Sequence, residues 1–272
     1  MSLKFFGTKS ITELVKYHFN RRSGMAGLSV VDIPAGKGLI SAVLKNRGAK
    51  VESYDLFPEF FQVNGIECKE ADLLGTLPIE SQSKDMILCQ EGIEHIPDQL
   101  KMLKEFNRIL KPEGRLIITA PNVSNLKSKL TYLFTESEHY KRMPPNELDA
   151  IWFSGQGKMY FGHIFLIGIQ RLRVLAVASG FKIKKVHTVR VNTTSFLFSF
   201  LYPVIALINT YAYLNNIFKN DRIDKRAKMK VYGEILKLNL HPSILFGGHL
   251  FIEFEKEKDL ENVNIYVNER EC

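Results

Sequence analysis

The sequence predicts an α/β fold built on a mostly parallel β-sheet. Short runs of β-branched and aliphatic residues alternate with segments whose apolar residues recur at helical spacing. The first run, LSVVDI at 28–33, is almost continuously apolar, as in a strand buried on both faces. A turn containing glycines follows it directly and leads into a helix. Strands and helices alternate in this way mainly in parallel sheets.

Each expected element has its own pattern. Residues 9–22 carry apolar side chains at helical spacing, and a second helix should follow the glycine turn with Leu39 and Leu44 on its apolar face. Pro97 suits the first position of a third helix, and a fourth is expected at 168–179. The expected strands are 28–33, 49–55, 66–72, 85–90, 115–120, 181–190 and 249–255.

Together these elements indicate a Rossmann-like, doubly wound α/β fold. Its sheet should have seven strands, mostly parallel with an antiparallel last strand, and two insertions. We expect four segments: an N-terminal helical extension at 1–27, a core at 28–190 with an irregular insertion at 121–163, an apolar and basic helical insertion at 191–248, and the last strand and tail at 249–272.

Composition limits the classes of partner. The chain has 37 Lys and Arg against 29 Asp and Glu, so the net charge of 37 − 29 = +8 favours an anionic lipid, a nucleic acid or a phosphorylated substrate. The three cysteines form no metal-binding spacing, so we expect a reducing compartment and no metal site. The N-terminus lacks a signal-peptide pattern, which predicts a cytoplasmic protein.

The main chemical signal is VVDIPAGKG at 30–38. Here a strand enters a turn at a helix start, where Gly36 and Gly38 would let a ligand approach the backbone and free N–H groups could bind an anionic group. A dinucleotide fingerprint would have a third glycine where Ser41 stands, which disfavours a nicotinamide-dependent oxidoreductase.

Acidic residues follow the next strands. Asp55 ends the second strand, where a carboxylate can accept hydrogen bonds from a ribose diol. Asp72 ends the third strand, and Gln90 and Glu91 end the fourth. Because the carboxyl ends of parallel strands share one edge of a sheet, these side chains should meet beside the glycine turn.

These motifs resemble those of class I S-adenosylmethionine-dependent methyltransferases of the type 11 group, over about residues 28–190. The matching segments are VVDIPAGKG, YDLFPEF at 54–60, ADLLGTLPI at 71–79, CQEGIEHIPD at 89–98 and LKPEGRLIITAPN at 110–122. Pro34 and Ala35 replace the usual Gly and Cys or Ser of the loop. This form, together with PNVSNLKSKLTYLF at 121–134 and GHI at 162–164, resembles a bacterial subset associated with surface-polysaccharide synthesis.

The resemblance implies S-adenosylmethionine as cofactor and assigns roles by position. Asp32 and the loop of Ala35, Gly36 and Gly38 would hold the amino-acid end of the cofactor. Asp55 would hold its ribose, and Asp72 and Leu73 would flank its adenine. Gln90 and Glu91 would lie in the same site, with Glu91 near the sulfonium.

Methyl transfer from a sulfonium needs mainly positioning, with a base only where the acceptor holds its proton tightly. His163 and His95 are the candidate bases, although each could instead be structural. Trp152 could line an acceptor pocket or anchor the first insertion.

Residues 195–214 form an uncharged apolar stretch of 20 residues. A crossing of the bilayer is disfavoured because the strands at 181–190 and 249–255 should share one sheet. The stretch could instead be a buried cover, or it could enter one leaflet. The basic residues at 219–230 favour peripheral contact of 195–230 with an anionic inner membrane face.

The leading functional hypothesis is methylation of a small or lipid-linked acceptor, such as a sugar of a surface glycan. RNA methylation agrees with the charge but has no recognisable RNA-binding motif, so nucleic acid is disfavoured. The third hypothesis, a catalytically silent membrane-associated binding module, is disfavoured by the intact loop with Asp55 and Asp72.

Overall fold

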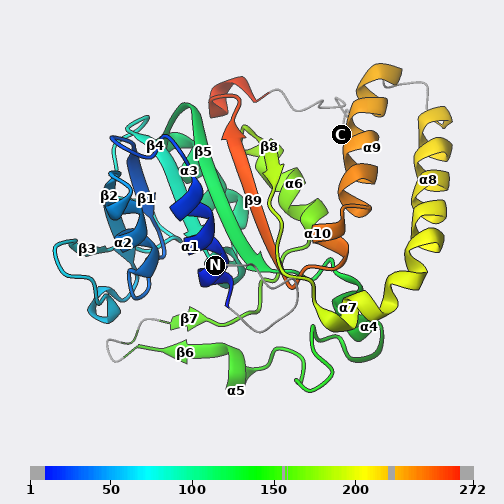
Figure 1. Cartoon of the computed structure of the whole chain (residues 1–272), viewed down its shortest axis with the longest axis horizontal. Helices are drawn as coiled ribbons and strands as arrows, with labels where there is room; N and C mark the ends of the chain where they lie inside the picture. The colour runs from blue at the N-terminus through cyan, green and yellow to red at the C-terminus, as the bar shows by residue number, and fades with distance from the viewer. Residues whose placement is uncertain (1–9, 155–156, 158, 220–223, 264–272) are drawn as a thin grey trace.

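The structure is a computed structural model that describes residues 10–154, 157, 159–219 and 224–263. A seven-stranded sheet forms its centre, with strand order β3-β2-β1-β4-β5-β9-β8 (Figure 1). β9 runs antiparallel to both neighbours and the other pairs are parallel, which confirms the expected topology. The strands are β1 (Ser29–Asp32), β2 (Lys50–Asp55), β3 (Cys68–Glu70), β4 (Lys84–Gln90), β5 (Leu110–Pro121), β8 (Phe181–Val186) and β9 (His249–Lys256).

Helices cover both faces of the sheet and create two apolar cores. α1 (Ile11–Arg21) and α2 (Leu39–Asn46) bury residues such as Phe19 on one face, while α3 (Gln99–Ile109) and α6 (Ile169–Ala178) bury Phe106 and others on the opposite face. This two-layer burial explains why β1 and β4 have continuously apolar centres, VV and MILC.

Several element boundaries differ from those expected, among them the starts of α3 and β5. α3 begins at Gln99 rather than Pro97, because the Asp98 side chain caps the helix by accepting a hydrogen bond from the Lys101 N–H (2.9 Å). β5 begins at Leu110, before the expected turn. The pairing of β5 with β4 shifts register there, so the turn residues are absorbed as an irregularity in the strand.

The first insertion is more regular than expected. It contains α4 (Leu126–Thr135), α5 (Glu147–Ala150) and a hairpin of β6 (Ile151–Phe153) and β7 (Met159–Phe161). Figure 1 shows this hairpin below the main sheet, at its carboxyl edge. The expectation of an irregular segment was wrong, because short cross-strand pairs give little periodic signal.

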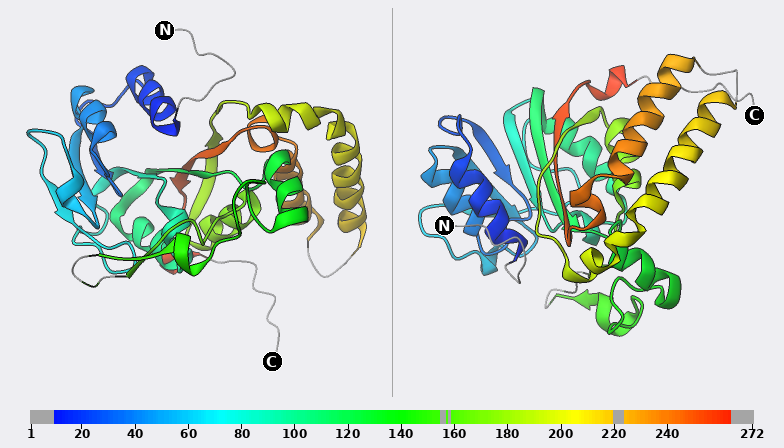
Figure 2. Two further views of the ribbon diagram at one scale, coloured as in Figure 1. Left: turned by 90° about the horizontal axis from the view of Figure 1, so that it is seen from below. Right: turned by 45° about the vertical axis from the view of Figure 1, so that its right-hand side comes forward.

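The second insertion is helical, as expected. It comprises α7 (Thr193–Leu197), the 3-10 helix η3 (Phe198–Leu201), α8 (Tyr202–Phe218), α9 (Lys225–Asn239) and α10 (Pro242–Leu245). α9 packs beside α6, and α8 forms the outermost layer beyond α9 (Figure 2). Three further 3-10 helices are η1 (Pro58–Phe60), η2 (Ile93–His95) and η4 (Leu260–Asn262).

One helical segment of the described chain, Thr193–Phe218, is long and apolar enough to cross a membrane, with a mean hydropathy of 1.5. None of its most apolar stretch is buried in the protein. The segment lies between β8 and β9, which pair directly. A single crossing would place these two strands on opposite sides of a membrane, so the sheet excludes it.

Candidate functional site

Two adjoining cavities lie at the carboxyl edge of the parallel strands. One has a volume of about 290 Å³ and is lined by residues that follow β2, β3 and β4 and by the β6–β7 hairpin. The other, of about 320 Å³, is lined by the glycine loop and the first turn of α2. Pro34 and Glu91 line both, so the cavities form neighbouring parts of one site.

Asp55 connects the glycine loop to the segment after β2. Its Oδ2 accepts a hydrogen bond from the Gly36 N–H (2.7 Å), and its Oδ1 accepts one from the Phe57 N–H (2.9 Å). Asp55 is 9% exposed and lines the cavity of about 290 Å³. Its remaining lone pairs can accept hydrogen bonds from hydroxyl groups there.

Asp32 lies at the end of a chain of two buried hydroxyl groups. Ser41 donates to Asp32 Oδ2 (2.6 Å), and Ser53 donates to Ser41 (2.9 Å). Burial raises the pKa of Asp32 to about 7, although the Ser41 hydrogen bond opposes this rise. Ser41, which the sequence singled out only as a missing glycine, therefore orients the acid at the base of the loop.

The two loop glycines have different roles. Gly36 has a φ of +52° and its Cβ position faces open space, so its backbone is accessible from the cavity. Gly38 has a φ of +78°, and a Cβ there would lie 2.4 Å from the Phe61 ring. Gly38 lines neither cavity. The sequence analysis expected Gly38 to let a ligand approach the backbone. In the structure, packing against Phe61 and the positive φ are what require a glycine at this position.

Gln90 provides an acceptor for a cationic group. Its Nε2 donates to the Thr12 hydroxyl (2.8 Å). Within the described residues its buried Oε1 has no hydrogen-bond partner. Both Gln90 and Thr12 line the cavity of the glycine loop. An unpaired carbonyl oxygen there fits the ammonium group of the amino-acid end of S-adenosylmethionine.

The cavity of about 290 Å³ has an apolar, partly aromatic lining. Leu73 and Asp72 contribute from the segment after β3, where Asp72 Oδ1 accepts a hydrogen bond from the Leu74 N–H (2.9 Å). Phe57 also lines this cavity and packs edge-on against Tyr160 of β7, with ring centroids 5.0 Å apart. A flat ring such as adenine fits between such walls.

Glu91 and Glu94 are two buried acids beside the shared wall of the cavities. Glu91 Oε1 accepts a hydrogen bond from the Thr119 hydroxyl (3.1 Å). Glu94 is fully buried, and neither of its carboxylate oxygens has a hydrogen-bond partner among the described residues. Burial raises the pKa of both acids, and the proximity of Glu91 raises that of Glu94 further. Protonation of Glu94 removes a buried negative charge beside Glu91 and so reduces the cost of burying the pair.

The two candidate bases lie together, but only one lines a cavity. His95 lines the cavity of about 290 Å³, and its Nδ1 lies 2.7 Å from the Phe161 carbonyl oxygen. If Nδ1 carries the proton and donates to this oxygen, Nε2 is left as an acceptor. His163 lines neither cavity but packs edge-on against His95, with ring centroids 5.1 Å apart. Burial and the neighbouring His95 lower the pKa of His163.

Three side chains here could hold a metal ion, although the sequence predicted none. Glu94, His95 and His163 place ligand atoms within 4.8 Å of one another. Imidazole nitrogens and a carboxylate are common ligands of divalent transition metals.

The β6–β7 hairpin supplies a wall of the cavity, of which the sequence analysis had named Trp152 as a candidate. Trp152 lines the cavity and packs on Tyr160, with ring centroids 5.6 Å apart. The Trp152 ring also occupies the space beside Gly162, where a Cβ would lie 2.7 Å away. It therefore both lines the cavity and anchors the insertion. Aromatic enrichment at 151–161 was the only sequence signal for this wall.

The structure brings together nine of the eleven residues assigned from the sequence. Gly38 and His163 are the two that line neither cavity. Those that do are Asp32, Ala35, Gly36, Asp55, Asp72, Leu73, Gln90, Glu91 and His95.

Residues 31–118 match the model of a family described as a methyltransferase domain. Over 117 residues the chain is 32% identical to a ubiquinone biosynthesis O-methyltransferase of Xylella fastidiosa (strain M23), covering 39% of this chain and 46% of that protein. A ubiquinone biosynthesis O-methyltransferase of Xanthomonas oryzae pv. oryzae (strain PXO99A) is 30% identical over 152 residues, which cover 49% of this chain and 64% of that protein. The match therefore spans about half to two thirds of these relatives.

Solved structures show the same fold. A SAM-dependent methyltransferase from Archaeoglobus fulgidus aligns with a TM-score of 0.53 and 16% identity, over 90% of this chain and 94% of that one. The family match assigns residues 31–118 to a methyltransferase domain, and the solved structure shows that the chain has the fold of an S-adenosylmethionine-dependent methyltransferase.

Proposed function

We propose that the chain transfers the methyl group of S-adenosylmethionine to a hydroxyl oxygen of a small or lipid-linked acceptor. The observation that carries this proposal is the pair of cavities that share Pro34 and Glu91. One presents the polar groups that the cofactor's amino-acid end requires, and the other combines an apolar lining with an imidazole.

The cofactor would be held by groups already in place. Gly36 and Gln90 would bind its amino-acid end, Asp55 its ribose hydroxyls, and Leu73 and Phe57 its adenine. S-adenosylmethionine supplies an activated methyl group, so the protein contributes orientation and exclusion of water.

His95 is the residue we propose as the base. Its Nε2 can accept the hydroxyl proton of an acceptor in the cavity, and the Phe161 carbonyl oxygen fixes the ring through Nδ1. His163 packs behind it and can accept positive charge only at a cost, since its pKa is lowered by burial. A role for His163 in turnover remains a prediction.

A membrane surface is the proposed place of action. α8 exposes many large apolar side chains, among them Leu207 (71% exposed) and Tyr211 (70% exposed). The side chain of Asn239 donates to Asn209 (2.7 Å) and ties α8 to α9, whose first turns carry Lys225, Arg226 and Lys230. An apolar helix beside basic residues suits the boundary of an anionic leaflet, with the domain on its cytoplasmic side.

The relatives support an oxygen acceptor, because their names specify O-methylation within ubiquinone biosynthesis. A ubiquinone-pathway intermediate and a sugar of a lipid-linked surface glycan both satisfy the proposal. The sugar is the narrower prediction from the sequence.

The test is methyl transfer from labelled S-adenosylmethionine into a fractionated cell extract. We expect label in the lipid-extractable fraction, and mild acid should move it to the aqueous phase if the acceptor is a lipid-linked glycan. Label confined to RNA, or cofactor binding without any transfer, would contradict the proposal.

A further inference from the structure

A third cavity lies away from the proposed methyl-transfer site. It has a volume of about 430 Å³ and opens between α1 and the segment that continues from β8 beside β9. It shares no lining residue with either cofactor cavity. The volume is within the range of small-molecule sites, about 300–1,000 Å³.

The wall of this cavity is strongly basic. Arg21, Arg22, Lys185 and Arg190 line it, and no acidic residue does. Arg22 is neutralised, because it makes two hydrogen bonds to the Glu253 carboxylate, of 2.8 and 3.2 Å. No carboxylate of the described chain pairs with Arg21, Lys185 or Arg190, and the buried Arg190 Nε has no hydrogen-bond partner there.

A bulge in β8 places one of these cations. The register with β9 shifts between Ile183 and Lys185, so that Lys185 is paired with Glu253. Paired residues lie on the same face of a sheet, and Glu253 faces α1 through Arg22. The bulge therefore turns Lys185 toward α1 and the cavity.

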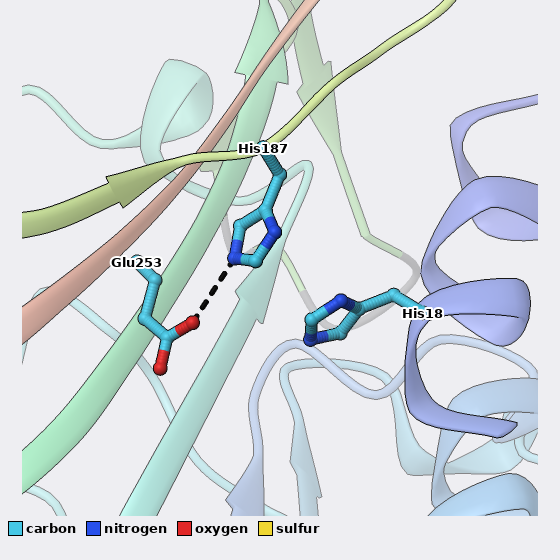
Figure 3. A group of neighbouring side chains, drawn as sticks. All are labelled: His18, His187 and Glu253. Carbon is cyan, nitrogen blue, oxygen red and sulfur yellow. Dashed lines mark hydrogen bonds and ion pairs between the residues drawn. The ribbon is translucent and has the colours of Figure 1, made fainter. Parts of the chain in front are cut away.

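Aromatic rings form another part of the wall. His18 and His187 lie with ring centroids 4.5 Å apart, and His187 packs on Phe251 at 4.5 Å. Figure 3 shows His187 bonded to Glu253 with His18 opposite. Burial lowers the pKa of His18 to about 4, so this ring is neutral at physiological pH and offers a flat, uncharged face.

The same histidines do not form a metal site. His18, His187 and Glu253 have ligand atoms within 4.8 Å of one another. However, Arg22 occupies both Glu253 oxygens, and its NH1 nitrogen lies 3.3 Å from His18 Nε2. A metal ion would have to displace this guanidinium.

We propose that this cavity binds a nucleoside diphosphate, with its phosphates at Arg21, Lys185 and Arg190 and its base against His18 and His187. Arginine and lysine side chains without carboxylate partners are suited to phosphate, and aromatic faces to a base. This ligand is separate from the proposed methyl acceptor, because the cavity does not reach the methyl-transfer site.

The test is calorimetry of the full-length chain saturated with S-adenosylhomocysteine, so that the cofactor site cannot bind the probe. Uridine diphosphate should bind, and more tightly than inorganic pyrophosphate or uridine. The Lys185→Gln/Arg190→Gln variant should weaken binding by at least about tenfold, because it removes two charged donors. Lys182→Gln, on the same strand but tied to Glu255, is the matched control and should bind like the wild type.

Absence of binding by uridine diphosphate, or equal affinity in the double variant, would overturn the proposal. Equal affinity for pyrophosphate and uridine diphosphate would overturn the assignment of the rings to a base. The single variant Lys185→Gln provides the same comparison if the double variant unfolds. These outcomes are independent of methyl transfer, since no acceptor is present.

Discussion

Replacing Asp55 with asparagine is the sharpest single perturbation of the cofactor site. The carboxylate accepts hydrogen bonds from Gly36 on one side and Phe57 on the other. An asparagine has one carbonyl oxygen, so its NH₂ group must face one of these two N–H donors. It also loses the negative charge that would accept a ribose hydroxyl.

The expected loss follows from these contacts. A hydrogen bond to a charged group contributes about 1.5–3 kcal/mol, which corresponds to about a tenfold to hundredfold weaker affinity for S-adenosylhomocysteine. Calorimetry measures this ratio, and thermal unfolding reports any loss of stability.

Asp85→Asn is the matched control. Asp85 likewise accepts from a backbone N–H, that of Ser29 (2.8 Å), and from Lys111 (2.7 Å), but it lies at the start of β4, at the opposite edge of the sheet. This variant should lose stability and keep its cofactor affinity. Unchanged affinity in Asp55→Asn, or an equal loss in both variants, would refute the reasoning.

Three further predictions concern protonation, the base and the membrane. Burial raises the pKa of Glu94 above its ordinary value of 4.5, so the folded chain retains a proton that the unfolded chain releases. The free energy of unfolding should therefore fall as pH rises from about 5 toward neutrality. Glu94→Gln should flatten this slope in denaturant titrations. His95→Gln should lower kcat by about 10²–10⁴-fold without changing cofactor affinity. His163→Gln tests the second histidine in the same assay. If His95 is the base, EDTA should leave activity unchanged. Loss of activity on chelation would instead assign Glu94, His95 and His163 to a metal site. The wild type should float with anionic liposomes, and less of it should float in high salt. Leu207→Glu should reduce flotation without lowering Tm, because Leu207 is exposed. Wild-type protein that stays in the soluble fraction beside such vesicles would contradict the membrane proposal.

The strands and the cofactor-facing residues were predictable from local pattern. Apolar runs marked the centres of β1 and β4, and acids at or just after the ends of successive strands marked the carboxyl edge, because parallel strands necessarily bring those ends together. Asp55 and Asp72 could be assigned without knowledge of any side-chain contact.

The remaining features depend on contacts between segments far apart in the chain. Thr12 reaches Gln90 only because α1 packs on the sheet, and no local pattern specifies that contact. Gly38 resembles a ligand-binding glycine in sequence, whereas its space is taken by Phe61 from the next loop. The exposure of α8 was also undetermined, since an apolar helix has the same composition whether it is buried or bare.

The most direct test of the central claim is a calorimetric titration of the purified chain with S-adenosylhomocysteine and, separately, with NAD. The arrangement of Gly36, Asp55 and Gln90 predicts saturable binding of S-adenosylhomocysteine in a single class of sites and no binding of NAD. Binding of NAD without S-adenosylhomocysteine, or of neither ligand, would contradict the assignment of this site to S-adenosylmethionine.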